Sequence, residues 1–196
     1  KYRMVTVLMT EGALGQMIEP CTLPEFIEAP TLPWGFDGKY SYKKIGIFDR
    51  DSMKEAVELN QKYDAVRAVE QRWASEGIED ADYVFVAYGL PARSTLGAVR
   101  ALRADGHKVG LIRPITAWPF PFKAFEAVNP NVKGFITVEA NATGQLVDDV
   151  ALAAKKVLKP RNIPVYCLPA VYGVPSIHFI RQGYENIKAG GLKEVY

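Results

Sequence analysis

Short apolar runs alternate with helical patterns through the second half of the chain. Continuous apolar runs of four to six residues are typical of strands that are covered on both faces. The predicted strands are 83–88, 109–112, 135–138 and 165–168. The segments after them carry apolar residues at steps of three and four, which predicts helices. The predicted helices are about 96–106, 122–128, 144–158 and 177–188. Repeated strand–helix units predict the α/β class, a mostly parallel sheet with helices on both faces.

The first third of the chain has a different pattern. Lys1–Thr10 is nearly continuous in apolar residues and is predicted to be a strand, followed by a short helix after Gly12. Prolines and glycines between 20 and 38 exclude regular elements, so this stretch is interpreted as an extended connection. From Ser52, apolar residues recur at helical spacing as far as Trp73, which predicts one long helix. The expected parts are residues 1–50, a linker helix in 51–80 and a complete α/β domain at 81–196.

The composition of the chain argues against nucleic acid and membranes as partners. The 196 residues are 48% hydrophobic and 23% charged, which is ordinary for a globular protein. The formal net charge is +2 and no dense basic cluster is present, so nucleic acid is not an expected partner. The longest apolar runs are too short to span a bilayer, so no membrane partner is expected either.

Two cysteines, Cys21 and Cys167, limit the metal chemistry of the chain. They cannot supply the four thiolates that an iron–sulfur cluster needs, and a Cys-rich zinc site is excluded as well. We interpret both thiols as buried structural residues of a protein in a reducing, cytoplasmic compartment. The loops after the predicted strands contain neither the dinucleotide-binding glycine pattern nor a Walker-type phosphate loop. We therefore predict no catalytic, cofactor-binding or metal-binding residue in this chain.

Three sequence strings carry a family resemblance. They are Thr10-Glu-Gly-Ala-Leu-Gly-Gln-Met-Ile-Glu-Pro20, Val109-Gly-Leu-Ile-Arg-Pro-Ile-Thr-Ala-Trp-Pro-Phe-Pro121 and Val138-Glu-Ala-Asn-Ala-Thr-Gly-Gln-Leu-Val-Asp-Asp-Val150. Their order and spacing resemble the C-terminal half of the alpha subunit of 2-oxoacid:ferredoxin oxidoreductases. The branched-chain (2-oxoisovalerate) and 2-oxoglutarate members match best. The resemblance covers about residues 5–150, and the Arg-Pro-Ile-Thr-x-Trp-Pro-Phe-Pro string is its most specific part.

The resemblance implies a share in a thiamine diphosphate enzyme. Such enzymes oxidatively decarboxylate a 2-oxoacid to an acyl-CoA and CO2 and reduce ferredoxin. The implied fold at 81–196 resembles the transketolase C-terminal domain, preceded at 1–50 by the tail of a thiamine pyrimidine-type domain. The family's glutamate that activates thiamine lies upstream of the matched region. We therefore expect a fragment or split subunit that is inactive by itself and serves assembly and structure.

The resemblance also implies cofactors and partners. Thiamine diphosphate with Mg and iron–sulfur clusters would belong to the whole complex, with none bound by this chain alone. The implied partners are a diphosphate-binding beta subunit, a gamma subunit and a ferredoxin-like delta subunit. Ferredoxin and CoA would act at the level of the complex.

Nine residues in the three strings are candidate interface or loop-structuring positions. They are Gly12, Gly15, Gln16, Arg113, Trp118, Phe120, Glu139, Asn141 and Gln145. Arg113 and Glu139 each lie at the end of a predicted strand, and we expect them to form an ion pair across adjacent strands, with a substrate clamp as the alternative. Asn141 and Gln145 are expected to satisfy backbone groups in a loop.

The remaining candidates concern turns and aromatic side chains. Gly12 and Gly15 are expected to permit a tight strand-to-helix turn. The aromatic residues of 118–122, stiffened by prolines, favour a subunit interface, with a core position under their own helix as the competing interpretation.

Two other functional interpretations remain open. The chain could be the C-terminal portion of another thiamine enzyme, either transketolase-like or a 2-oxoacid dehydrogenase beta chain. It could also be a non-catalytic docking module that uses the same domain.

Overall fold

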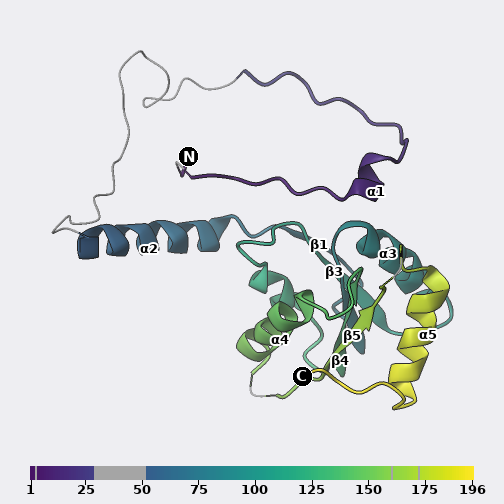
Figure 1. Cartoon of the computed structure of the whole chain (residues 1–196). Helices are drawn as coiled ribbons and strands as arrows, with labels where there is room; N and C mark the ends of the chain where they lie inside the picture. Colours follow the sequence, from purple (N-terminus) through teal and green to yellow (C-terminus); the bar gives the residue numbers. More distant parts are fainter. Residues whose placement is uncertain (3, 29–51, 160, 172) are drawn as a thin grey trace.

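A five-stranded sheet forms the centre of the protein (Figure 1). The computed structural model describes residues 1–2, 4–28, 52–159, 161–171 and 173–196. The strand order is β1-β3-β2-β4-β5. The strands are β1 (Trp73–Glu76), β2 (Tyr83–Val86), β3 (Val109–Pro114), β4 (Gly134–Glu139) and β5 (Val165–Pro169). Four of them run parallel, and β1 pairs antiparallel with β3 at one edge. The predicted mostly parallel sheet is confirmed.

Helices cover the two faces of the sheet (Figure 1). The helical elements are α1 (Gly12–Gly15), α2 (Ser52–Val69), α3 (Gly89–Ala104), the 3-10 helix η1 (Phe122–Ala127), α4 (Leu146–Val157) and α5 (Ile177–Lys188). Helices α3 and α5 share one apolar core with one side of the sheet, and α4 and η1 share a second core with the other side. No helix among the described residues is long and apolar enough to cross a membrane.

Alternation along each strand divides its side chains between these two cores. On β2, Phe85 faces α3 and α5, whereas Val84 and Val86 face α4. Successive side chains of a strand point to opposite faces, so a strand buried on both sides is apolar at most of its positions. This explains why the central strands are continuous apolar runs in the sequence.

The predicted N-terminal strand is wrong. Residues 4–10 contain no strand, and Val5 and Leu8 are 85% and 90% exposed. An apolar run becomes a strand only where another strand supplies hydrogen-bond partners, and no described strand pairs with this segment. The helix expected after Gly12 is confirmed as the single turn of α1. The extended connection falls largely on residues 29–51, outside the described part of the chain.

The predicted long helix ends earlier than its apolar spacing suggested. Helix α2 ends at Val69, and Trp73 begins β1 instead of continuing the helix. Strand β1 pairs with β3 in the register Ala74 to Arg113. The linker range 51–80 therefore contains an edge strand of the sheet, and the division of the chain into three parts remains a prediction.

The aromatic segment after β3 packs partly inward, so Phe120 is not a surface residue. Phe120 is 7% exposed, and its ring centroid lies 5.5 Å from Phe122 and 6.1 Å from Phe125. The interface role expected for Phe120 is therefore wrong, because its ring fills the core under η1 and α4. Trp118 remains 46% exposed and packs edge-on against Tyr63 of α2 at 5.5 Å between centroids.

The difference in burial between Phe120 and Trp118 can be measured as a difference in stability between two variants. Phe120→Ala should lower the free energy of unfolding by about 3–5 kcal/mol, because it empties a buried site. Trp118→Ala, the matched variant, should cost much less, because half of its ring area is already in water. Urea denaturation of the full chain measures both values. Equal losses for the two variants would contradict the burial assigned to Phe120.

Candidate functional site

The crevice between β2 and β4 is where a ligand is expected in a sheet of this topology. The chain leaves β2 through α3 toward β3 on one side, and leaves β4 through α4 toward β5 on the other. The point between two neighbouring strands whose connections leave in opposite directions is called the switch point of the sheet. Ligands of open α/β sheets bind there, beyond the carboxyl ends of the strands. The residues that line this point here are Tyr88 after β2, Glu139 at the end of β4, and Glu11 from the N-terminal arm (residues 4–28).

Glu139 occupies the N-terminus of α4. Its Oε2 accepts hydrogen bonds from the backbone N–H groups of Gln145 at 2.7 Å and Leu146 at 2.9 Å, and its Oε1 accepts from Val147 at 3.2 Å. The residue is only 2% exposed. The first N–H groups of a helix have no partner within the helix and carry positive partial charge, so a carboxylate is well placed there.

The loop that joins β4 to α4 is built around this carboxylate. Asn141 donates from Nδ2 to Glu139 at 3.0 Å, and its Oδ1 accepts from the N–H groups of Thr143 and Gly144. Gly144 has φ +73°, and a Cβ there would lie 2.9 Å from the sulfur of Cys167. Gln145 precedes α4 and makes no side-chain cap. Asn141 therefore satisfies backbone groups as expected. The same expectation is wrong for Gln145, because only its backbone N–H takes part, donating to Glu139.

Glu11 plays a similar part at α3. Its Oε2 accepts from the backbone N–H of Leu90 at 3.0 Å, in the first turn of α3. Gly89 has φ +59°, and a Cβ there would come within 3.2 Å of the same carboxylate oxygen. Further along the arm, Glu19 pairs with Arg93. The arm thus contacts the start of α3 through two carboxylates.

Two carboxylates of the protein already occupy the positions at the switch point where an anion would bind. Both helix N-termini that face it already hold a carboxylate, Glu139 at α4 and Glu11 at α3. Burial raises the pKa of the neighbouring Tyr88 hydroxyl, and the charges of Glu139 and Glu11 raise it further. A phosphate or diphosphate would meet negative charge here, so the geometry disfavours this crevice as a phosphate site.

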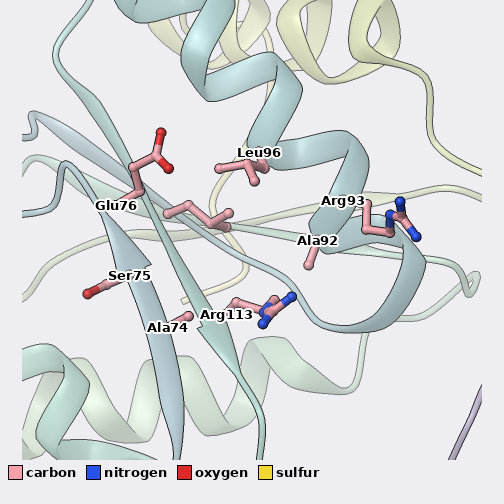
Figure 2. Close-up of a pocket in the computed structure, with 8 residues that line it drawn as sticks. Ala74, Ser75, Glu76, Ala92, Arg93, Leu96 and Arg113 are labelled. Carbon is pink, nitrogen blue, oxygen red and sulfur yellow. The ribbon is translucent and has the colours of Figure 1, made fainter. Parts of the chain in front are cut away.

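A second hollow lies along the β1–β3 edge, on the face covered by α3. It is a cleft of about 200 Å³ lined by Ala74, Ser75, Glu76, Ala92, Arg93, Leu96, Leu111 and Arg113. In Figure 2 the Arg113 side chain points toward the first turn of α3, below Ala92, whereas Arg93 turns away from the sheet. We call this hollow the Arg113 cleft.

The expected ion pair between Arg113 and Glu139 is wrong. Their strands, β3 and β4, are separated by β2. The two side chains also point to opposite faces of the sheet, because Arg113 lies against α3 and Glu139 lies under the start of α4. The pairing was expected because each residue lies at the end of a predicted strand, and the local sequence does not show which strands are neighbours in the sheet.

The other candidate positions lie apart from both hollows. Gly12, Gly15 and Gln16 are exposed in or just after the turn of α1. The tight strand-to-helix turn expected of the two glycines is wrong, because no strand precedes α1 among the described residues and a Cβ at either glycine would have nothing within 4 Å. Trp118 contacts α2, and the Arg67 guanidinium lies 5.7 Å from its ring centroid. Their role in an interface therefore remains a prediction.

Sequence reasoning missed Glu11 and misjudged one cysteine. Glu11 acts across 79 residues, and no local pattern links it to Leu90. Cys21 is exposed, contrary to the expectation that both thiols are buried, because the arm around it covers little of its surface. Cys167 is half-buried, and burial raises the pKa of its thiol.

Side chains that commonly bind metals do not gather at one place among the described residues. Within them, no group of three or more His, Cys, Asp or Glu side chains lies close enough together to hold a metal ion.

Comparison with known proteins identifies the relatives of this chain. Residues 81–168 match the family model of the pyruvate:ferredoxin oxidoreductase core domain II. Over 161 residues the chain is 38% identical to ketoisovalerate oxidoreductase subunit VorB of Methanothermobacter marburgensis, covering 79% of this chain and 46% of that protein. The resemblance to 2-oxoacid:ferredoxin oxidoreductase subunits is confirmed.

Two further relatives fit this assignment. The 2-oxoglutarate synthase subunit KorA of the same organism is 25% identical over 202 residues, covering 84% of this chain and 52% of that protein. The chain thus spans about half the length of the curated relatives it matches. The 2-oxoglutarate:ferredoxin oxidoreductase of Magnetococcus marinus, solved with 2-oxoglutarate, coenzyme A and succinyl-CoA, superposes with a TM-score of 0.55. It is 21% identical over 70% of this chain and 24% of that chain, so it supports the fold alone.

Removing the buried carboxylate should weaken the fold. Glu139→Ala leaves three backbone donors and the Asn141 amide without their acceptor, so we expect the free energy of unfolding to fall by about 2–4 kcal/mol. Glu126→Ala is the control, because Glu126 is an exposed carboxylate on η1 and its loss should cost within about 0.5 kcal/mol. Denaturant unfolding of the full chain measures the free energy of unfolding of both variants. A Glu139→Ala variant as stable as the control would show that the carboxylate does not hold α4.

Proposed function

We propose that this chain is part of a thiamine diphosphate-dependent 2-oxoacid:ferredoxin oxidoreductase. The proposed reaction is oxidative decarboxylation of a 2-oxoacid to an acyl-CoA and CO2, with reduction of ferredoxin. The observation that carries the proposal is the 38% identity to a ketoisovalerate oxidoreductase subunit over 79% of this chain. The match of residues 81–168 to a core domain of ferredoxin-linked oxidoreductases supports it independently of that relative.

Within such an enzyme, the proposed role of this portion is assembly and structure. Three features support this role. The switch point is occupied by Glu139 and Glu11, the described residues offer no metal ligand set, and the β1–β3 edge exposes an arginine and apolar side chains. A domain whose switch point is occupied by its own carboxylates and whose sheet has an exposed edge is suited to docking against other chains.

The cofactors and partners follow from the proposed complex. Thiamine diphosphate with magnesium and the iron–sulfur clusters would be held outside the described residues. A diphosphate-binding beta subunit, a gamma subunit and a ferredoxin-like delta subunit would complete the assembly. Ferredoxin would accept the electrons, and CoA would accept the acyl group.

The activity is tested on the native assembly. The complex is purified through a tag on this chain and assayed for CoA-dependent ferredoxin reduction with 2-oxoisovalerate, 2-oxoglutarate and pyruvate. We expect at least one of these acids to support turnover that requires CoA. An assembly that contains this chain but reduces ferredoxin with none of them would contradict the proposed reaction.

The assembly role gives a separate prediction for the isolated chain. Thiamine diphosphate with magnesium should leave its melting temperature unchanged, because a ligand stabilises a protein only by binding its folded state. Thermal unfolding with and without millimolar cofactor measures this, and the purified assembly is the positive control. Saturable stabilisation of the isolated chain would place cofactor binding in this portion and overturn the assembly role.

A further inference from the structure

Arginines around α3 are paired with carboxylates of the same chain, with one exception. Arg93 pairs with Glu19, Arg100 with Glu76 at 2.8 Å, and Arg103 with Asp80 at 3.1 Å. Arg113 faces α3 from the neighbouring strand, yet no described residue forms a hydrogen bond or ion pair with its guanidinium. The chain thus provides carboxylates for three of these four cations.

The Arg113 cleft has a polarity along its length. Arg113 lies opposite Ala74 of β1, and Glu76 lies opposite Leu111, two residues away. Two residues along a strand are about 7 Å, so the unpaired Arg113 guanidinium lies near one end of the cleft and the Glu76–Arg100 ion pair near the other. Ala92, Leu96 and Leu111 supply apolar surface between them. Figure 2 shows Leu96 projecting from α3 on the side of the Glu76 side chain, with Arg113 further along the cleft.

The surface around the cleft has the composition of a protein interface. Ala74 and Ser75 of β1 are exposed, and Ile115, two residues beyond Arg113, is 56% exposed. Interfaces are enriched in arginine and large apolar side chains at their centres. A short edge strand such as β1 also leaves backbone groups facing outward.

We propose that the Arg113 cleft receives an acidic side chain, Asp or Glu, from a partner subunit, next to an aliphatic residue that fills the apolar middle. The carboxylate pairs with Arg113 because the charge of Glu76, at the other end of the cleft, is already paired with Arg100, and this fixes the direction of the docked segment. This inference rests on the proposed function, because it names how the assembly role is carried out.

A protein side chain fits this cleft better than a free organic acid does. Small-molecule sites usually exceed about 300 Å³ and place several polar groups around the ligand. This cleft is smaller, and Arg113 is its one unpaired cation among the described residues. A single cation beside an apolar floor can anchor one side chain of a larger contact surface.

Variants at position 113 test the pairing in the assembled protein. Arg113→Gln should weaken binding of the full chain to the remaining subunits at least about tenfold, measured by interferometry, because a charge-assisted hydrogen bond is lost. Arg181→Gln is the matched control, since Arg181 pairs with Asp105 within the chain and neither residue lines the cleft, and it should change binding less than about threefold. The melting temperature of the isolated Arg113→Gln chain should equal that of the unaltered chain.

A zero-length cross-link identifies the partner group. The Arg113→Lys chain, treated with a carbodiimide in the assembly, should become linked at position 113 to an Asp or Glu of another subunit. Mass spectrometry of the linked peptide names that residue. The yield of the cross-link should be the same whether a 2-oxoacid or acetate is present at millimolar concentration before the carbodiimide is added.

The outcomes separate this inference from the proposed function. Binding of Arg113→Gln within threefold of the unaltered chain overturns the inference, as does a cross-link to a carboxylate of this same chain. A cross-link that forms in the presence of acetate but not of a 2-oxoacid, with the assembly intact, assigns the cleft to a small acid and also overturns the inference. Failure of the unaltered chain to assemble with any subunit contradicts the proposed function itself, and the inference with it.

Discussion

A buried carboxylate holds the end of the sheet to the helix that follows it. Moving Glu139 out of water is costly, and the fold offsets that cost with three backbone N–H groups, the Asn141 amide and the positive end of α4. Because these donors come from the loop and the first turn of α4, the side chain fixes where the helix begins. The packing of α4 over β4 and β5 depends on that start, and with it one of the two cores.

This constraint also decides what the switch point can do. The crevice that would bind a ligand in many α/β proteins is closed by Glu139 on one side and by Glu11 on the other. Similarity to oxidoreductase subunits and a closed switch point are compatible if catalysis takes place elsewhere in the complex. In the proposed complex, the exposed edge at β1 and β3 would contribute to assembly through Arg113 and the apolar side chains beside it.

The sequence pattern predicted the central strands and α5 well because these elements are buried or strongly amphipathic. Their boundaries agree with the structure within about two residues, and the limits predicted for α5 are those observed, Ile177–Lys188. Strand β1 was missed because Trp73–Glu76 alternates weakly and has half of its residues in water. The order of the strands, and hence the separation of Arg113 from Glu139, depends on tertiary packing that no local spacing records.

The candidate site was predicted less well than the fold. Phe120 and Trp118 belong to one string, yet one ring is buried and the other half-exposed, because the turn after β3 directs them differently. The role of Glu139 as a helix cap was within reach of the sequence, since a glutamate precedes the helix by seven residues. Its bend back onto Leu146 required the glycine at 144 and the Asn141 turn, which only the folded chain brings together.

The most direct test of this account is a cryo-electron microscopy structure of the native assembly with thiamine diphosphate and magnesium bound. The account predicts that the carboxylate of Glu139 still contacts the N–H groups of 145–147 and that the diphosphate lies outside residues 81–196. Density for the diphosphate at the N-terminus of α4, with Glu139 displaced, would contradict it.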